Sequence, residues 1–115
     1  MNGVLLIDKP SGCTSHDVCL KVKRRLKAAK IGHTGTLDPL ATGVLPLCLN
    51  RGTKLVQFLL HGEKEYEGSM RLGLITDTQD IQGAVLGMSR SLPQGRAAVE
   101  AACAGLCGAI EQLPP

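Results

Sequence analysis

Residues 32 to 46 of this 115-residue chain read Gly32-His33-Thr34-Gly35-Thr36-Leu37-Asp38-Pro39-Leu40-Ala41-Thr42-Gly43-Val44-Leu45-Pro46. Asp38 is the only carboxylate in residues 18–62. Pro39 favours an extended conformation at the residue before it, and Gly35 and Gly43 permit sharp turns on either side. The stretch therefore predicts an ordered loop that displays one carboxylate. Asp followed by Pro is also a common start of a type I turn, so a purely structural role for Asp38 is the alternative.

The segment before this loop predicts a strand and a basic helix. Residues 3–7 are apolar and are followed by turn residues, which is typical of a buried strand. Thr14 and Asp17 fit a capping box, so we expect a helix from residue 14 or 15 to about residue 29. Residues 1–60 carry nine Lys and Arg against three acids. This basic first half favours a polyanionic partner, and a solvated basic surface is the alternative.

The segment after the loop predicts further strands and helices. Pro46 favours an edge or irregular position for the strand in which it lies. Because strands and helices are interspersed along the chain, the expected class is α/β or α+β, a sheet with helices packed on it. The expected elements are strands over 44–49, 64–74, 84–88 and 109–113 and helices over 53–60 and 93–107.

Composition narrows the function classes. The five cysteines include no Cys-x-x-Cys pair, so we expect them to be reduced and mostly buried in a cytosolic protein. Asp77 and Asp80 lie in a polar loop where a turn is favoured over a metal site. No apolar run approaches the length of a membrane span, and no targeting segment precedes the first strand. These residues therefore predict no metal site and no membrane partner.

The stretch from Gly32 to Pro46 resembles the catalytic motif of the TruB family of pseudouridine synthases. The resemblance extends over the whole chain and implies a pseudouridine synthase-like fold, a mixed, largely antiparallel sheet flanked by helices. The other matching segments are Gly3 to Ser15, Gly52-Thr53-Lys54, Lys64-Glu65-Tyr66, residues 72–83 and residues 108–115.

The resemblance implies a reaction and a set of site residues. The reaction is the isomerisation of uridine-55 to pseudouridine in the T loop of tRNA, without a cofactor or metal. Asp38 would be the catalytic carboxylate, as nucleophile or as base, Tyr66 would stack on the flipped base, and His33 would line the pocket. The residues alone also allow a core tyrosine and a loop histidine bonded to the backbone. The predicted RNA-backbone contacts are Lys9, Lys21, Arg24 and Arg25.

The chain departs from the family pattern at its end, because family members continue well past Pro115. We therefore expect residues 1–115 to be the N-terminal part of a catalytic domain, without its remainder or the C-terminal RNA-binding domain. Alone, this part is expected to be inactive or weak, whereas the full-length enzyme is expected to be a cytoplasmic monomer that binds the T-arm stem-loop. The alternatives are a synthase that acts on another RNA and an RNA-binding fragment without catalysis.

Overall fold

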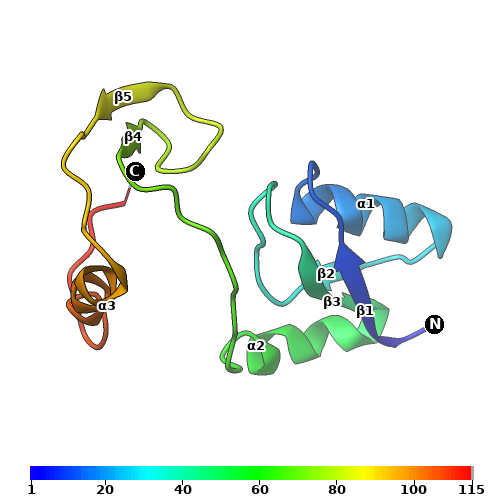
Figure 1. Ribbon diagram of the computed structural model, residues 1–115. Helices are drawn as coiled ribbons and strands as arrows, with labels where there is room; N and C mark the ends of the chain where they lie inside the picture. The colour runs from blue at the N-terminus through cyan, green and yellow to red at the C-terminus, as the bar shows by residue number, and fades with distance from the viewer. Residues whose placement is uncertain (115) are drawn as a thin grey trace. The chain divides into compact units, whose positions relative to one another are not determined.

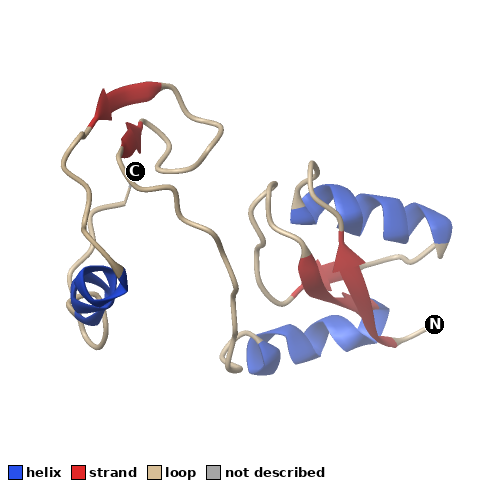
Figure 2. Ribbon diagram, viewed as in Figure 1, coloured by secondary structure: helices blue, strands red, loops and turns tan. Residues whose placement is uncertain are grey.

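The computed structural model describes residues 1–114. The chain divides into two compact units, of which the first is Met1–Glu65 and the second begins at Tyr66. Antiparallel strands and helices occur in both units (Figures 1 and 2), so the predicted mixed class is confirmed.

The first unit is built on a three-stranded antiparallel sheet. Its strands are β1 (Gly3–Lys9), β2 (Ile31–His33) and β3 (Gly43–Leu49), in the order β1-β3-β2. Since β2 and β3 are consecutive and antiparallel, residues 34–42 form the loop of a hairpin. β1 pairs with β3 over its whole length, and Lys9 lies opposite Gly43. The end of β1 is therefore next to the point where the hairpin loop enters β3.

Two expectations for this sheet are corrected. Pro46 lies in the middle strand and not at an edge, which is tolerated because β2 ends at His33, opposite Leu47. The carbonyl of Pro46 still accepts a hydrogen bond from the amide of Thr34, at 3.2 Å. β1 is half-buried and not fully buried, because its side chains alternate between the core and solvent.

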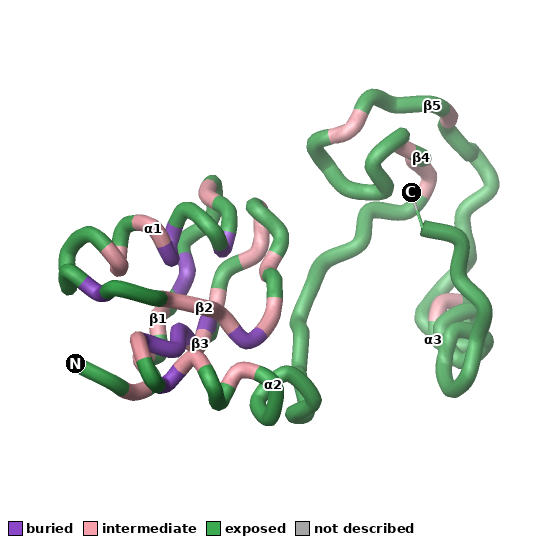
Figure 3. Tube along the Cα trace, turned by 180° about the vertical axis from the view of Figure 1, so that it is seen from behind, coloured by how far each residue is buried: buried purple, intermediate pink, exposed green. Residues whose placement is uncertain are grey.

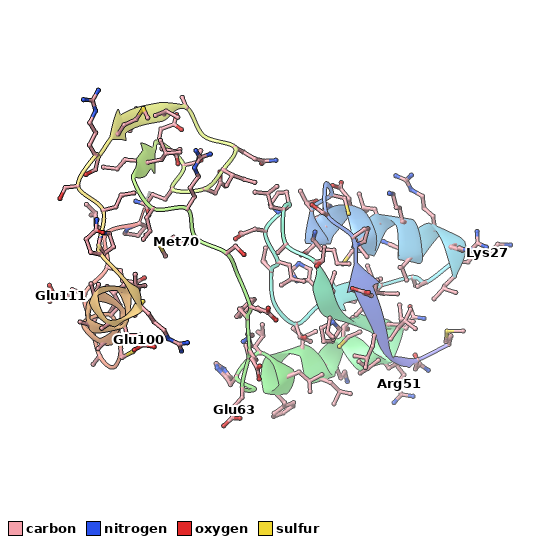
Figure 4. The ribbon with its side chains drawn as sticks, in the orientation of Figure 1. Lys27, Arg51, Glu63, Met70, Glu100 and Glu111 are labelled. Carbon is pink, nitrogen blue, oxygen red and sulfur yellow. The ribbon has the colours of Figure 1, made fainter. Side chains whose placement is uncertain are left out.

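The helix α1 (Ser15–Arg25) begins as predicted and ends earlier than predicted. Thr14 and Asp17 form the capping box through hydrogen bonds in both directions. Lys27 has a φ of +50°, and the amide of Ala28 donates to the carbonyl of Lys23 at 3.0 Å, which closes the helix in the manner of a Schellman motif. Figure 4 shows Lys27 at the far end of α1, extending outward. The helix therefore stops at Arg25 and not near residue 29.

The core of the first unit lies between α1 and the sheet. Figure 1 shows α1 along one side of the sheet and the segment of η1 (Asn50–Leu55) and α2 (Val56–Leu59) along the other. Buried positions concentrate in this unit (Figure 3), and Leu37 in the hairpin loop packs against them. The hydrophobic core cluster consists of Val18, Cys19, Leu45 and Leu47.

The second unit contains a short hairpin and a helix. The strands β4 (Leu74–Thr76) and β5 (Val85–Met88) pair antiparallel, and α3 spans Arg96–Ala104. The predicted strand over 64–74 is wrong up to residue 73, since none of its residues before Leu74 pairs with another described strand. Residues 109–113 also form no strand. Alternation alone does not supply the backbone partners that a strand requires.

The cysteines divide between the two units. Cys19 and Cys48 are buried in the first unit, and burial raises the pKa of both thiols. Cys103 and Cys107 are exposed, so the expectation that the cysteines are mostly buried is correct only for the first unit. Through residue 114, no helix is long and apolar enough to cross a membrane.

Candidate active site

Asp38 lies in the hairpin loop between β2 and β3. The backbone carbonyl of Asp38 accepts a hydrogen bond from the amide of Ala41 at 3.0 Å, so the Asp-Pro turn predicted from the sequence is present. Gly35 and Gly43 have φ values of +147° and +123°, as the expected sharp turns require. The Asp38 side chain is exposed, and within residues 1–114 it makes no hydrogen bond or ion pair. The loop thus combines an ordered turn with a displayed carboxylate.

The ammonium group of Lys9 anchors this loop from the end of β1. Lys9 has 0% exposure, and its Nζ donates to the carbonyls of Pro10 at 2.8 Å, Pro39 at 3.3 Å and Ala41 at 2.7 Å. An ammonium has three N–H groups, so these bonds use all of them. The structure therefore does not support the predicted contact between Lys9 and an RNA backbone. Lys9 instead ties β1 to the turn that carries Asp38.

A second anchor comes from the start of α1. The Ser15 hydroxyl is buried and accepts a hydrogen bond from the amide of Leu37 at 2.9 Å. It also donates to the carbonyl of Leu37, at 3.2 Å. The amide of Gly12 donates to the carbonyl of Pro39 at 2.8 Å. Leu37 and Pro39, the residues on either side of Asp38, are thus both held by the turn that joins β1 to α1.

His33 closes β2 and is half-buried at the base of the loop. Its Nδ1 lies 2.8 Å from the carbonyl oxygen of Gly35. Since a carbonyl only accepts, Nδ1 carries the proton and donates it. In the neutral ring this leaves Nε2 as an acceptor. The backbone bond that the sequence left as the alternative reading of His33 is therefore present, and Nε2 remains available to a ligand.

Tyr66 is the first residue of the second unit, whereas the Asp38 loop belongs to the first. Its side chain is 67% exposed, so the reading as a core tyrosine does not hold in the described chain.

Lys64, which belongs to the first unit, lies beside the loop: a Cβ added to Gly35 would be 3.6 Å from Lys64 Cε. Its Nζ donates to the carbonyl of Leu60 at 2.8 Å.

The other predicted RNA-contacting residues lie on α1. Lys21, Arg24 and Arg25 are exposed, and the described part of the chain offers them no ion pair. Asp17 is the only acid on this helix. No group of three or more potential metal ligands occurs in residues 1–114. The predicted site residues of the first unit, other than Lys9, are thus an exposed carboxylate, a half-buried histidine and three exposed cations on α1.

Sequence reasoning missed the two anchors of the loop. Gly12 and Ser15 were recognised as part of a family-like segment, but no contact with the Asp38 loop was inferred for them. A local signal existed for Lys9, because period-two alternation in β1 places it on the same face as Leu5 and Ile7. For Ser15 no local signal exists, since its partner Leu37 is 22 residues away.

The sequence of this chain matches a known protein family. Residues 23–115 match the model of "TruB family pseudouridylate synthase (N terminal domain)". The tRNA pseudouridine synthase B of Cupriavidus taiwanensis is 52% identical over 115 residues, which cover 100% of this chain and 36% of the relative. The protein of the same name from Burkholderia mallei is 51% identical, with 100% and 38% covered. The chain thus spans little more than a third of the length of these curated relatives.

One solved structure is also similar over part of the chain. It is a structure of an H/ACA RNP bound to a substrate RNA containing 2′-deoxyuridine. The match has a TM-score of 0.48 and 50% identity, and it covers 49% of this chain and 18% of the other.

Proposed function

The chain belongs to the TruB family of pseudouridylate synthases, and on this premise we propose that it is the N-terminal part of an enzyme that isomerises uridine-55 to pseudouridine in the T loop of tRNA. A cytoplasmic location and a monomeric full-length enzyme belong to the same proposal. The observation that carries it is Asp38, a displayed carboxylate on a loop that is anchored on both sides.

The reaction exchanges one bond to the ribose for another. The bond from C1′ to N1 of uracil breaks, the base turns, and C1′ joins C5. The proton on C5 is lost and N1 gains one, so atoms and electrons balance without a co-reactant. Asp38 acts on the ribose, either as a nucleophile at C1′ or as a base in an elimination path. Both roles need a carboxylate oxygen that can reach the ribose, and the Asp38 side chain is exposed in the described residues.

The base has to leave its stack before a carboxylate can reach the ribose. In this proposal Tyr66 stacks on the flipped base. His33 offers Nε2 as an acceptor to an N–H or O–H group of the RNA, a role that its bond to Gly35 supports. Lys21, Arg24 and Arg25 bind phosphates, since they are exposed on one helix and have no competing acid beyond Asp17.

The test is tritium release from uridine C5 in a T-arm stem-loop RNA. Because the chain spans about a third of its relatives, the assay uses a fusion in which residues 1–115 replace the matching part of the Cupriavidus taiwanensis relative. We expect release by the fusion, none above background by its Asp38→Asn variant, and little by residues 1–115 alone. Asn has nearly the shape of Asp and keeps the turn, so the variant isolates the carboxylate.

The outcomes separate the candidate functions. A folded Asp38→Asn fusion that retains the parent rate contradicts the catalytic role of Asp38. Release from other RNAs, but not from the T-arm stem-loop, favours a synthase with a different substrate. RNA binding without release by the folded fusion favours a binding function.

A further inference from the structure

We propose that Ser15 is a positioning residue for the Asp38 carboxylate: its hydroxyl bonds both backbone groups of Leu37 and thereby fixes the peptide that leads into Asp38. The inference rests on the proposed function, because it takes Asp38 as the catalytic carboxylate. It concerns a residue outside the loop, 22 positions earlier in the chain than the Leu37 to which it is bonded.

The geometry restricts the direction of the Cα–Cβ bond of Asp38 in two steps. The carbonyl of Leu37 belongs to the peptide group that ends at the nitrogen of Asp38, and that group is planar. Holding its oxygen with the Ser15 hydroxyl at 3.2 Å therefore restricts φ of Asp38. The carbonyl of Asp38 is held by the amide of Ala41 at 3.0 Å, which restricts ψ. With both torsions restricted, the Cα–Cβ bond of Asp38 has one direction.

The burial of Ser15 explains why its hydroxyl bonds to Leu37. Ser15 is 1% exposed, so its hydroxyl has no access to bulk water and depends on Leu37 for its partners. The Leu37 side chain packs against the core, which holds the same residue from the other side. Pro39, after Asp38, is held separately by Gly12 and Lys9. Ser15 is therefore the anchor on the N-terminal side of Asp38.

The contact is separable from the stability of α1. Thr14, not Ser15, is the N-cap, and its hydroxyl accepts from the amide of Asp17 at 3.0 Å. Ser15→Ala removes the bonds to Leu37 and leaves the cap, whereas Thr14→Ala removes the cap and leaves the bonds to Leu37. The two variants sit on neighbouring residues and both delete a hydroxyl. Thr14→Ala is thus a matched control for a merely structural effect.

The experiment has two measurements. Amide hydrogen exchange is followed by NMR in the 115-residue chain, with the amide of Cys48 in β3 as a report on the fold. In Ser15→Ala we expect the Leu37 amide to exchange about tenfold faster, the factor that one lost hydrogen bond gives. In Thr14→Ala we expect no change at Leu37. Steady-state kinetics are measured on the fusion described above, with the same two variants.

We expect Ser15→Ala to lower kcat by about tenfold to a hundredfold, the range that a small misplacement of a catalytic group produces, with KM nearly unchanged. Thr14→Ala is expected to lower the thermal midpoint but not kcat. Unchanged exchange at Leu37, or a kcat lowered equally in both variants, overturns the inference. A folded parent fusion without turnover overturns the proposed function, and the catalytic part of the inference with it, while the exchange rates still decide whether Ser15 holds the loop.

Discussion

Replacing Lys9 with Met tests the anchoring of the Asp38 loop most directly. Met keeps much of the apolar stem of Lys9 and removes the ammonium. Pro39 keeps its bond from the amide of Gly12, so the loss falls on the carbonyls of Ala41 and Pro10. A hydrogen bond to a charged group contributes about 1.5 kcal/mol, and Lys9→Met removes the two that go to the carbonyls of Ala41 and Pro10. We therefore expect the free energy of unfolding to fall by about 3 kcal/mol.

The assay for Lys9→Met is urea unfolding of the 115-residue chain, followed by circular dichroism. Lys21→Met is the matched control, because Lys21 is exposed on α1 and its replacement is expected to change stability by less than about 0.5 kcal/mol. Equal stabilities of the two variants would refute the reasoning. The salt dependence of RNA affinity, measured where both variants are folded, gives a second comparison. Lys21→Met is expected to reduce its slope by about one phosphate contact, and Lys9→Met to leave the slope unchanged.

Two further outcomes follow from the first unit. Hydrogen bonds from the Thr14 hydroxyl and amide hold the pKa of Asp17 below its ordinary value, so this contribution to stability is present above about pH 4 and is lost as the pH falls through the lowered pKa. Thermal unfolding between pH 6 and pH 2 should therefore show a flatter profile for Asp17→Asn than for the parent, and parallel profiles would contradict this. Gly52→Ala places a Cβ 2.5 Å from the backbone oxygen of Gly3, and we expect about 2 kcal/mol of destabilisation in urea unfolding. A Gly52→Ala chain as stable as the parent would show that this close approach is not rigid.

The features predicted correctly from sequence are those that depend on neighbouring residues. The capping box of Thr14 and Asp17 and the turn that begins at Asp38 are each closed by bonds over three residues. Such signals are complete within a short window, so the residue types determine the geometry. Gly35 and Gly43, which are expected to permit sharp turns, both have positive φ values in the structure.

The features predicted wrongly depend on partners elsewhere in the chain. Residues 64–73 alternate as a strand should, but no described strand pairs with them. β2 was not predicted, because three residues are too few for a period and only pairing with β3 makes them a strand. The missing N–H of Pro46 predicts an edge or irregular position, and Pro46 lies in the middle strand just beyond the end of β2, where that donor is not needed.

The positive charge of residues 1–60 does not reveal that one of its lysines, Lys9, is buried. The predicted RNA-backbone contacts include Lys9, the one charged side chain that is buried in the described chain. The period-two alternation of β1 predicts instead that the Lys9 side chain is buried, since Leu5, Ile7 and Lys9 share the inward face. The ammonium of a buried lysine needs hydrogen-bond acceptors. Lys9 lies opposite Gly43, where the hairpin loop enters β3, and the carbonyl of Ala41 in that loop accepts from its Nζ. Strand periodicity, weighed before net charge, would therefore have moved Lys9 from the RNA-contacting surface to the support of Asp38.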